Sequence, residues 1–148
     1  MLRSRNFAGR APCWTAPAGN ATTEHYDPYD PPDPEEWLDM DESQRIHLAE
    51  DYHRRAGIRL PNAQAHAIFH VTVENQAALG GEIPVRGTLE RLMGEGLDRH
   101  EAIHAIASVL SGHVFDITRG KPARPDANAA YFAALGKLTA ESWRRAYR

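Results

Sequence analysis

The residues whose types and spacing can do chemistry are paired histidines. Residues 98–104 read DRHEAIH, which contains His-Glu-x-x-His at His100 and His104. Residues four apart lie on one face of a helix, about 6 Å apart along its axis. Two imidazoles placed in this way can bind one zinc ion at about 2.0–2.1 Å each. In hydrolases with this motif the glutamate, here Glu101, takes a proton from the metal-bound water. The motif therefore predicts His100 and His104 as metal ligands and Glu101 as a catalytic base.

A second histidine pair with the same spacing lies upstream. His66 and His70 are four residues apart, and Glu74 follows one helical turn later. If the two helices pack antiparallel, both pairs point into one seam, which could then hold a closed zinc, a zinc with an open position, or two metals. His53 lies on the apolar side of an earlier helix and is a further candidate, with a surface-facing position as the equal alternative.

The same residues also have a purely structural interpretation. With eight histidines in 148 residues, His-x3-His arises by chance in about one of two or three such chains, and His-Glu-x-x-His in roughly a few per cent. Asp98 and Glu101 match a capping box, and a glutamate that caps a helix cannot freely deprotonate water. His70 and His104 would then be core histidines bonded to tyrosine, aspartate or backbone groups. The sequence leaves both interpretations open.

The elements that must position these side chains are helices. From residue 41 onward, apolar residues recur at helical spacing, and no segment has a convincing strand pattern. Capping residues and glycines predict helices at 41–57, 62–81, 87–96, 98–120 and 126–138, with a last turn or two in 139–148. We expect an all-α fold, in which residues 41–148 form a compact bundle of about five helices.

Residues 1–40 differ from the rest of the chain. They are rich in Pro, Gly, Asp and Asn and poor in aliphatic residues, which predicts an extended or disordered, largely irregular arm. The stretch YDPYDPPDP should not be helical, because each proline pushes its predecessor toward extended geometry. Tyr26, Tyr29 and Trp37 are the side chains that can attach this arm to the bundle.

Composition limits the function classes. The net charge is −3 with both signs interspersed, so the chain lacks the basic stripe that holds nucleic acid. No apolar run approaches the length of a membrane span. The one cysteine, Cys13, cannot form an internal disulfide, and we expect a cytoplasmic location. A surplus apolar helix face can be buried against a second copy of the chain, so a homo-oligomer is an alternative to a monomer.

In these motifs the chain resembles a small bacterial family catalogued as domain of unknown function 1841. The resemblance covers about residues 48–138, through DYH ending at His53, NAQAHAIFHVTVENQ at 62–76, IPVR at 83–86, HEAIH at 100–104 and NAAYFAAL at 128–135. The pattern residues that it implies are His53, His66, His70, Gln76, His100, Glu101 and His104. Ser108 and Gly112 stand where the family often has glutamate. The family glutamate before Gln76 is absent, and Glu74 lies one position earlier. These departures point to altered metal binding or a lost activity. The family brings no known function with it.

Two functions from different classes follow from these patterns. The first is metal binding, with zinc as the metal and iron or manganese as alternatives. The predicted ligands are His66, His70, His100 and His104, with His53 and Glu74 as further candidates. An open coordination position would permit metal-dependent hydrolysis with Glu101 as base, on a substrate that the sequence does not indicate, whereas a closed shell would make the metal structural. The second function is a non-catalytic interaction or assembly module whose histidines are structural.

Overall fold

The computed structural model describes residues 24–120 and 127–147, and over these residues the chain is helical with no strand. The helices are α1 (Pro34–Asp39), α2 (Glu42–Arg55), α3 (Ala63–Ala78), α4 (Val85–Gly94), α5 (Arg99–Thr118), α6 (Ala127–Lys137) and α7 (Ala140–Ala146). A short 3-10 helix, η1 (Gly80–Glu82), joins α3 to α4. The predicted all-α class is confirmed. No helix in the described ranges has the length and apolar character that a bilayer crossing requires.

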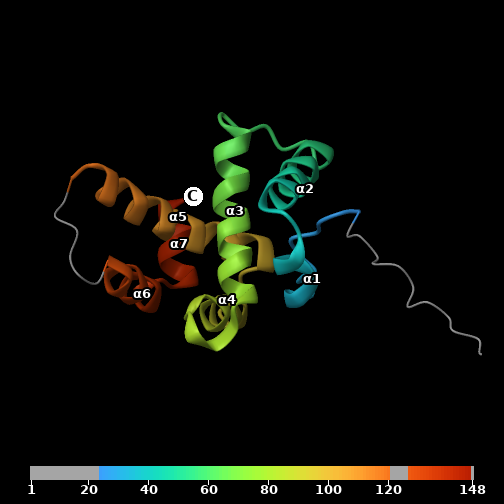
Figure 1. Ribbon diagram of the computed structural model, residues 1–148. Coiled ribbons are helices and arrows are strands. Elements are labelled where there is room, and N and C mark those ends of the chain that lie inside the picture. The colour runs from blue at the N-terminus through green and yellow to red at the C-terminus, as the bar shows by residue number, and fades with distance from the viewer. Residues whose placement is uncertain (1–23, 121–126, 148) are drawn as a thin grey trace, which may run out of the picture.

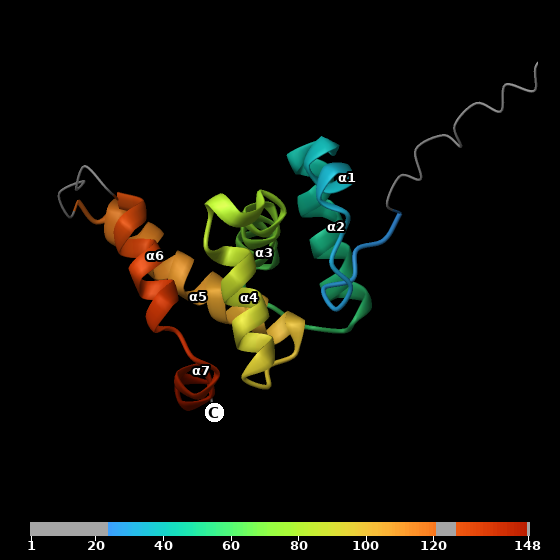
Figure 2. The same cartoon turned by 90° about the horizontal axis from the view of Figure 1, so that it is seen from below.

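Helix α3 lies at the centre of the fold, because α1, α2, α4 and α5 all pack against it. Figure 1 shows α3 upright, with α1 and α2 on one side and α6 on the other. Figure 2 looks along α3 and shows α5 lying across it. The two helices that carry the histidine pairs therefore cross steeply instead of running antiparallel, and the site forms where they cross.

Local capping explains where the two central helices begin. The Asn62 side chain accepts a hydrogen bond from the Ala65 amide at 3.0 Å at the start of α3. The Asp98 side chain accepts one from the Glu101 amide at 2.8 Å at the start of α5. Each cap satisfies an amide that has no partner inside its own helix.

The end of the arm is more ordered than the sequence predicted. Pro34 occupies the first turn of α1, where a missing amide proton costs nothing, and Asp33 accepts from the amides of Glu35 and Glu36. The predicted arm, residues 1–40, therefore contains one short helix that the sequence did not predict. Trp37 is fully buried and anchors α1 against α3. Residues 1–23 lie outside the described part of the chain.

Two apolar clusters make up the core, and α3 contributes to both. The larger cluster joins α3, α4, α5 and α6 and includes Val73, Leu92, Ile103, Ile106 and Leu135. The smaller cluster joins the arm to α1, α2 and α3 through Tyr26, Trp37, Leu48, Ala49, Ala67 and Val71. Burial of these side chains fixes the positions of α2, α3 and α5 relative to one another. Those three helices carry the histidines.

Candidate metal centre

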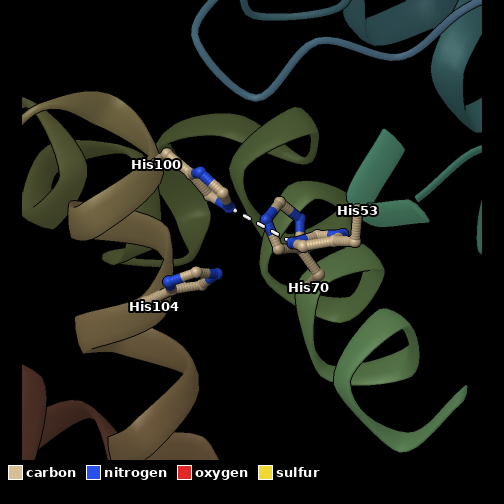
Figure 3. Close-up of side chains that lie close together, drawn as sticks. All are labelled: His53, His70, His100 and His104. Atoms are coloured by element: carbon tan, nitrogen blue, oxygen red, sulfur yellow. Dashed lines mark hydrogen bonds between the residues drawn. The ribbon is translucent and has the colours of Figure 1, made fainter. Parts of the chain in front are cut away.

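Five histidines from three helices converge where α2, α3 and α5 meet. Ligand atoms of His53, His70, His100 and His104 all lie within 4.8 Å of one another. Figure 3 shows these rings turned toward a common space, with His53 from α2, His70 from α3 and the other two from α5. His66 adjoins them, since its Nε2 lies 3.1 Å from His53 Nε2. We call these five residues the histidine cluster. Both predicted pairs meet in it, and His53 takes the buried position instead of the surface one.

Hydrogen bonds decide which nitrogen of His53 can bind a metal. Its Nδ1 lies 2.7 Å from the carbonyl oxygen of Ala49. A carbonyl can only accept, so Nδ1 carries the proton and Nε2 carries the lone pair. That lone pair faces His66 Nε2 at 3.1 Å and His100 Nε2 at 3.3 Å. One lone pair can accept one good hydrogen bond. A cation shared by these nitrogens would instead bind the lone pairs of all of them.

A chain of buried hydrogen bonds also decides which nitrogen of His70 can bind a metal. The Tyr26 hydroxyl donates to Glu74 Oε1 at 2.5 Å, so its oxygen accepts from His70 Nδ1 at 3.1 Å. Arg99 donates from both Nη atoms to the two Glu74 oxygens, at 2.7 and 2.8 Å, and from Nη1 to the Pro28 carbonyl at 2.9 Å. We call this arrangement the Arg99–Glu74–Tyr26–His70 chain. It leaves the lone pair of His70 on Nε2, toward the other imidazoles, as outer hydrogen bonds do for metal-binding histidines.

Two nitrogens of the cluster are buried without a hydrogen-bond partner in the described part of the chain. They are Nε2 of His70 and Nε2 of His104. Buried polar atoms are almost always paired, so an unpaired one needs a physical reason. Here both belong to the group of four imidazoles whose ligand atoms converge. A bound cation is the partner that this arrangement fits.

The cluster holds its imidazoles in the neutral, metal-binding form. Burial is the main cause that lowers the pKa of all five histidines. Repulsion between neighbouring imidazoles lowers the pKa of His104 further, to about 3. The pKa of His100 falls to about 4, although the nearby charges of Asp98 and Asp27 oppose the decrease. At neutral pH the rings are therefore uncharged and their lone pairs are available.

The nitrogen separations can be compared with those around an ion. Two nitrogens bound at about 2.0–2.1 Å are about 3.4 Å apart at a tetrahedral angle, about 2.9 Å apart at a right angle and about 4.1 Å apart when opposite. The 3.3 Å contact between Nε2 of His53 and Nε2 of His100 matches neighbouring ligands. The 4.8 Å spread of the group of four is wider than a tetrahedron allows. The spread also exceeds the separation of opposite ligands, so one ion bound by all four needs an inward movement of the rings.

Neither of the predicted carboxylates belongs to the group of four histidines. Glu74 is buried, but its oxygens accept from Arg99 and Tyr26, so it supports His70 instead of binding the ion. The Glu101 side chain is exposed, and its amide donates to Asp98. This is the Asp98 half of the predicted capping box. Asp98 therefore caps α5 through the Glu101 amide, and the Glu101 side chain is separate from the group of four histidines.

Sequence reasoning missed Arg99 and assigned Tyr26 only to anchoring. A signal for Arg99 was present, because a buried glutamate on a largely apolar helix needs a cationic or donor partner. Glu74 is such a residue on α3, and it is 2% exposed. No comparable signal identified Tyr26, which lies in the proline-rich arm and reaches Glu74 across 48 residues of sequence.

A pocket of about 290 Å³ borders one side of the cluster. Its lining combines three histidines with apolar, aromatic and hydroxyl side chains and contains no Asp, Glu, Lys or Arg in the described chain. The residues are His66, Phe69, His70, His104, Ala107, Ser108, Ser111, Trp143 and Tyr147. Elsewhere aromatic rings cover the cluster, with Tyr29 edge-on to His100 and Tyr52 edge-on to His53 and His100. The pocket therefore gives the cluster a side that a small molecule can approach.

The geometry of the site is the basis on which its function is assigned. In comparisons with protein-family models, curated proteins and solved structures, nothing matches this chain. The motif resemblance described above therefore stays a prediction. What the structure does provide is a buried cluster of histidines that can hold a metal ion.

Proposed function

We propose that this protein binds one divalent transition-metal ion in the histidine cluster, with zinc as the metal and iron or manganese as alternatives. The observation that carries the proposal is the pair of buried, unpaired Nε2 atoms of His70 and His104 within the described group of converging imidazoles. The ligands would be His53, His70, His100 and His104. Neutral imidazoles suit zinc and iron, whereas manganese prefers oxygen ligands, so manganese is the weakest of the three.

We propose metal-assisted hydrolysis as the chemistry, provided that the ion keeps an open position toward the pocket. The metal would then lower the pKa of a bound water toward about 7. Glu101 is exposed and separate from the described ligand group. His66 is better placed to accept the proton of that water, because it lines the pocket and stands beside the four ligands. The alternative is an ion whose coordination shell is closed by protein ligands and whose role is structural.

The resemblance to the family named above belongs to the same proposal. Its histidine positions are the five that make up the cluster in this chain. Its pattern residue Gln76 accepts a hydrogen bond of 2.7 Å from Tyr131, which lies in the Ala-Tyr helix of that pattern. Two motifs that are far apart in sequence therefore contact each other, as expected if the pattern describes one fold. Family membership is supported by this contact and remains a proposal.

A non-catalytic interaction module is the second candidate function. The far end of α5 exposes three large apolar side chains, Val114, Phe115 and Ile117. A small protein rarely exposes such a group without a use for it, and burial against a partner is one such use. In this alternative the histidines of the cluster would themselves be structural and would pack α2, α3 and α5 together.

Metal analysis of protein purified without a histidine tag tests the proposal. The protein should be dialysed against zinc, freed of loose metal and measured by mass spectrometry of the metal content. One zinc per chain is expected, with loss in the His70→Ala and His104→Ala variants. His47→Ala is the matched control, because His47 is exposed on α2 and should leave the zinc content unchanged. Zinc that remains in both cluster variants, or unchanged melting after chelation of wild-type protein, would contradict the proposal.

A further inference from the structure

We propose that the pocket beside the histidine cluster binds a small organic anion, with its charged group on the metal and its apolar body against Phe69 and Trp143. This inference rests on the proposed metal binding and extends it by naming the class of ligand. It follows from two independent features, which are the charge left at the cluster and the chemistry of the pocket wall.

The four proposed ligands carry no negative charge. The group of four histidines contributes only neutral imidazoles, so a bound divalent ion keeps its charge. The one buried carboxylate nearby, Glu74, is already neutralised by two hydrogen bonds from Arg99. Asp27 and Asp98 act electrostatically on His100, and both are exposed and absent from the pocket wall. An uncompensated buried charge is costly, so an external anion that reaches the ion is stabilised.

The pocket wall determines what kind of anion fits. None of its described lining residues is Lys or Arg, so the metal is the source of attraction for negative charge. Phe69, Ala107 and Trp143 offer apolar surface, and the Ser108 hydroxyl donates to the Ala105 carbonyl, which leaves its oxygen free to accept. The volume of about 290 Å³ lies at the lower end of ordinary ligand pockets, at about 300–1,000 Å³. A single ring with one anionic group is therefore a suitable ligand.

Three probes separate the contributions of charge and apolar body. Benzoate has both, acetate has the charge alone, and benzamide has the ring alone. The protein is first loaded with cobalt(II), whose visible spectrum reports changes in the ligands of the ion, and the cobalt content per chain is measured. Benzoate should shift the spectrum at a concentration at least about tenfold lower than acetate, because only benzoate buries a ring. Benzamide should leave the spectrum unchanged, and calorimetry should detect no benzoate binding to metal-free protein.

Two variants test whether benzoate binds in this pocket. Ser108→Leu fills part of the space and should weaken benzoate at least about tenfold while acetate and cobalt affinities stay unchanged. Ser43→Leu is the control, because Ser43 is exposed on α2 and should leave all three affinities unchanged. Phe69→Ala removes an apolar contact and should also weaken benzoate alone, which provides a second test if Ser108→Leu folds poorly.

The outcomes separate this inference from the proposed metal binding. One cobalt per chain with equal affinities for benzoate and acetate would keep the metal site and overturn the pocket ligand. The same holds if benzoate binds metal-free protein equally well, or if neither pocket variant weakens it. Failure to bind cobalt would overturn both proposals together.

Discussion

The Tyr26 hydroxyl connects the buried ion pair to the metal centre, so its removal tests whether the Arg99–Glu74–Tyr26–His70 chain orients a metal ligand. Tyr26→Phe deletes the oxygen that accepts from His70 Nδ1 at 3.1 Å and donates to Glu74 at 2.5 Å. The ring remains, and with it the packing against Trp37. Glu74 keeps both hydrogen bonds from Arg99. The variant therefore removes the acceptor of His70 and little else.

The size of the effect follows from that geometry. A buried donor left without an acceptor costs about 1–3 kcal/mol, so the metal-free variant should lose about that much unfolding free energy. Loss of the group that orients a metal-binding histidine typically lowers metal affinity by about 10–100-fold, and we expect a change in this range. Urea denaturation measures the first quantity. Competition with a chromophoric chelator measures the second.

Tyr131→Phe is the matched control for this experiment. Tyr131 and Tyr26 are both 3% exposed, and the Tyr131 hydroxyl donates to Gln76 at 2.7 Å, outside the histidine cluster. The control should lose stability of the same order while its zinc affinity stays at the wild-type value. If the zinc affinity of Tyr26→Phe lies within about threefold of the control, the chain does not orient His70 and the reasoning fails.

Three further predictions concern the ion pair, the cap and the cluster. Arg99→Met leaves the Glu74 carboxylate buried without its cation and should lower the unfolding free energy by about 3–5 kcal/mol in urea denaturation, part of which the double variant with Glu74→Gln should restore. An equal loss in both would contradict a buried ion pair. Glu101→Gln should keep zinc content and melting temperature, because the side chain is exposed, and a hydrolytic rate that collapses in this variant would restore Glu101 as the base. The folded-state pKa is about 4 for His100 and about 3 for His104, against about 6.5 in the unfolded chain, so the unfolded state binds more protons between these values. Metal-free protein should therefore lose stability as the pH falls from about 6.5 toward 4, by at most about 1.4 kcal/mol per pH unit for each histidine, and a flat urea midpoint between pH 7 and 5 would refute this.

The helices could be located from sequence because their signals are local. The predicted helices at 62–81 and 98–120 correspond to Ala63–Ala78 and Arg99–Thr118. Asn62 and Asp98 mark both starts through hydrogen bonds that span three residues. Helix α1 escaped prediction because the prolines before it suggested extended geometry throughout. The tolerance of the first helical turn for proline is the rule that decides this case.

The candidate site was predictable only in part, for the same physical reason. A four-residue spacing fixes which histidines share a face of one helix, so both pairs could be found. Which face meets which neighbour depends on packing, and α3 and α5 cross where an antiparallel seam was assumed. The ion pair of Glu74 with Arg99 joins residues 25 apart in sequence, and no local pattern relates them. Glu74 was therefore taken for a metal ligand, although packing gives it to an arginine.

The assignment of Glu74 to Arg99 has a consequence for reactivity. Had the carboxylate bound the ion, it would have removed part of the charge that draws water or an anion to the metal. With imidazoles alone, the ion keeps its full charge and links α2, α3 and α5 through the group of four histidines. Its binding energy therefore contributes to folding whether the ion is reactive or structural, and chelation should destabilise the protein in either case. Loss of stability on chelation thus establishes the ion but not its role, and ligand binding in the adjoining pocket is the measurement that separates a reactive ion from a structural one.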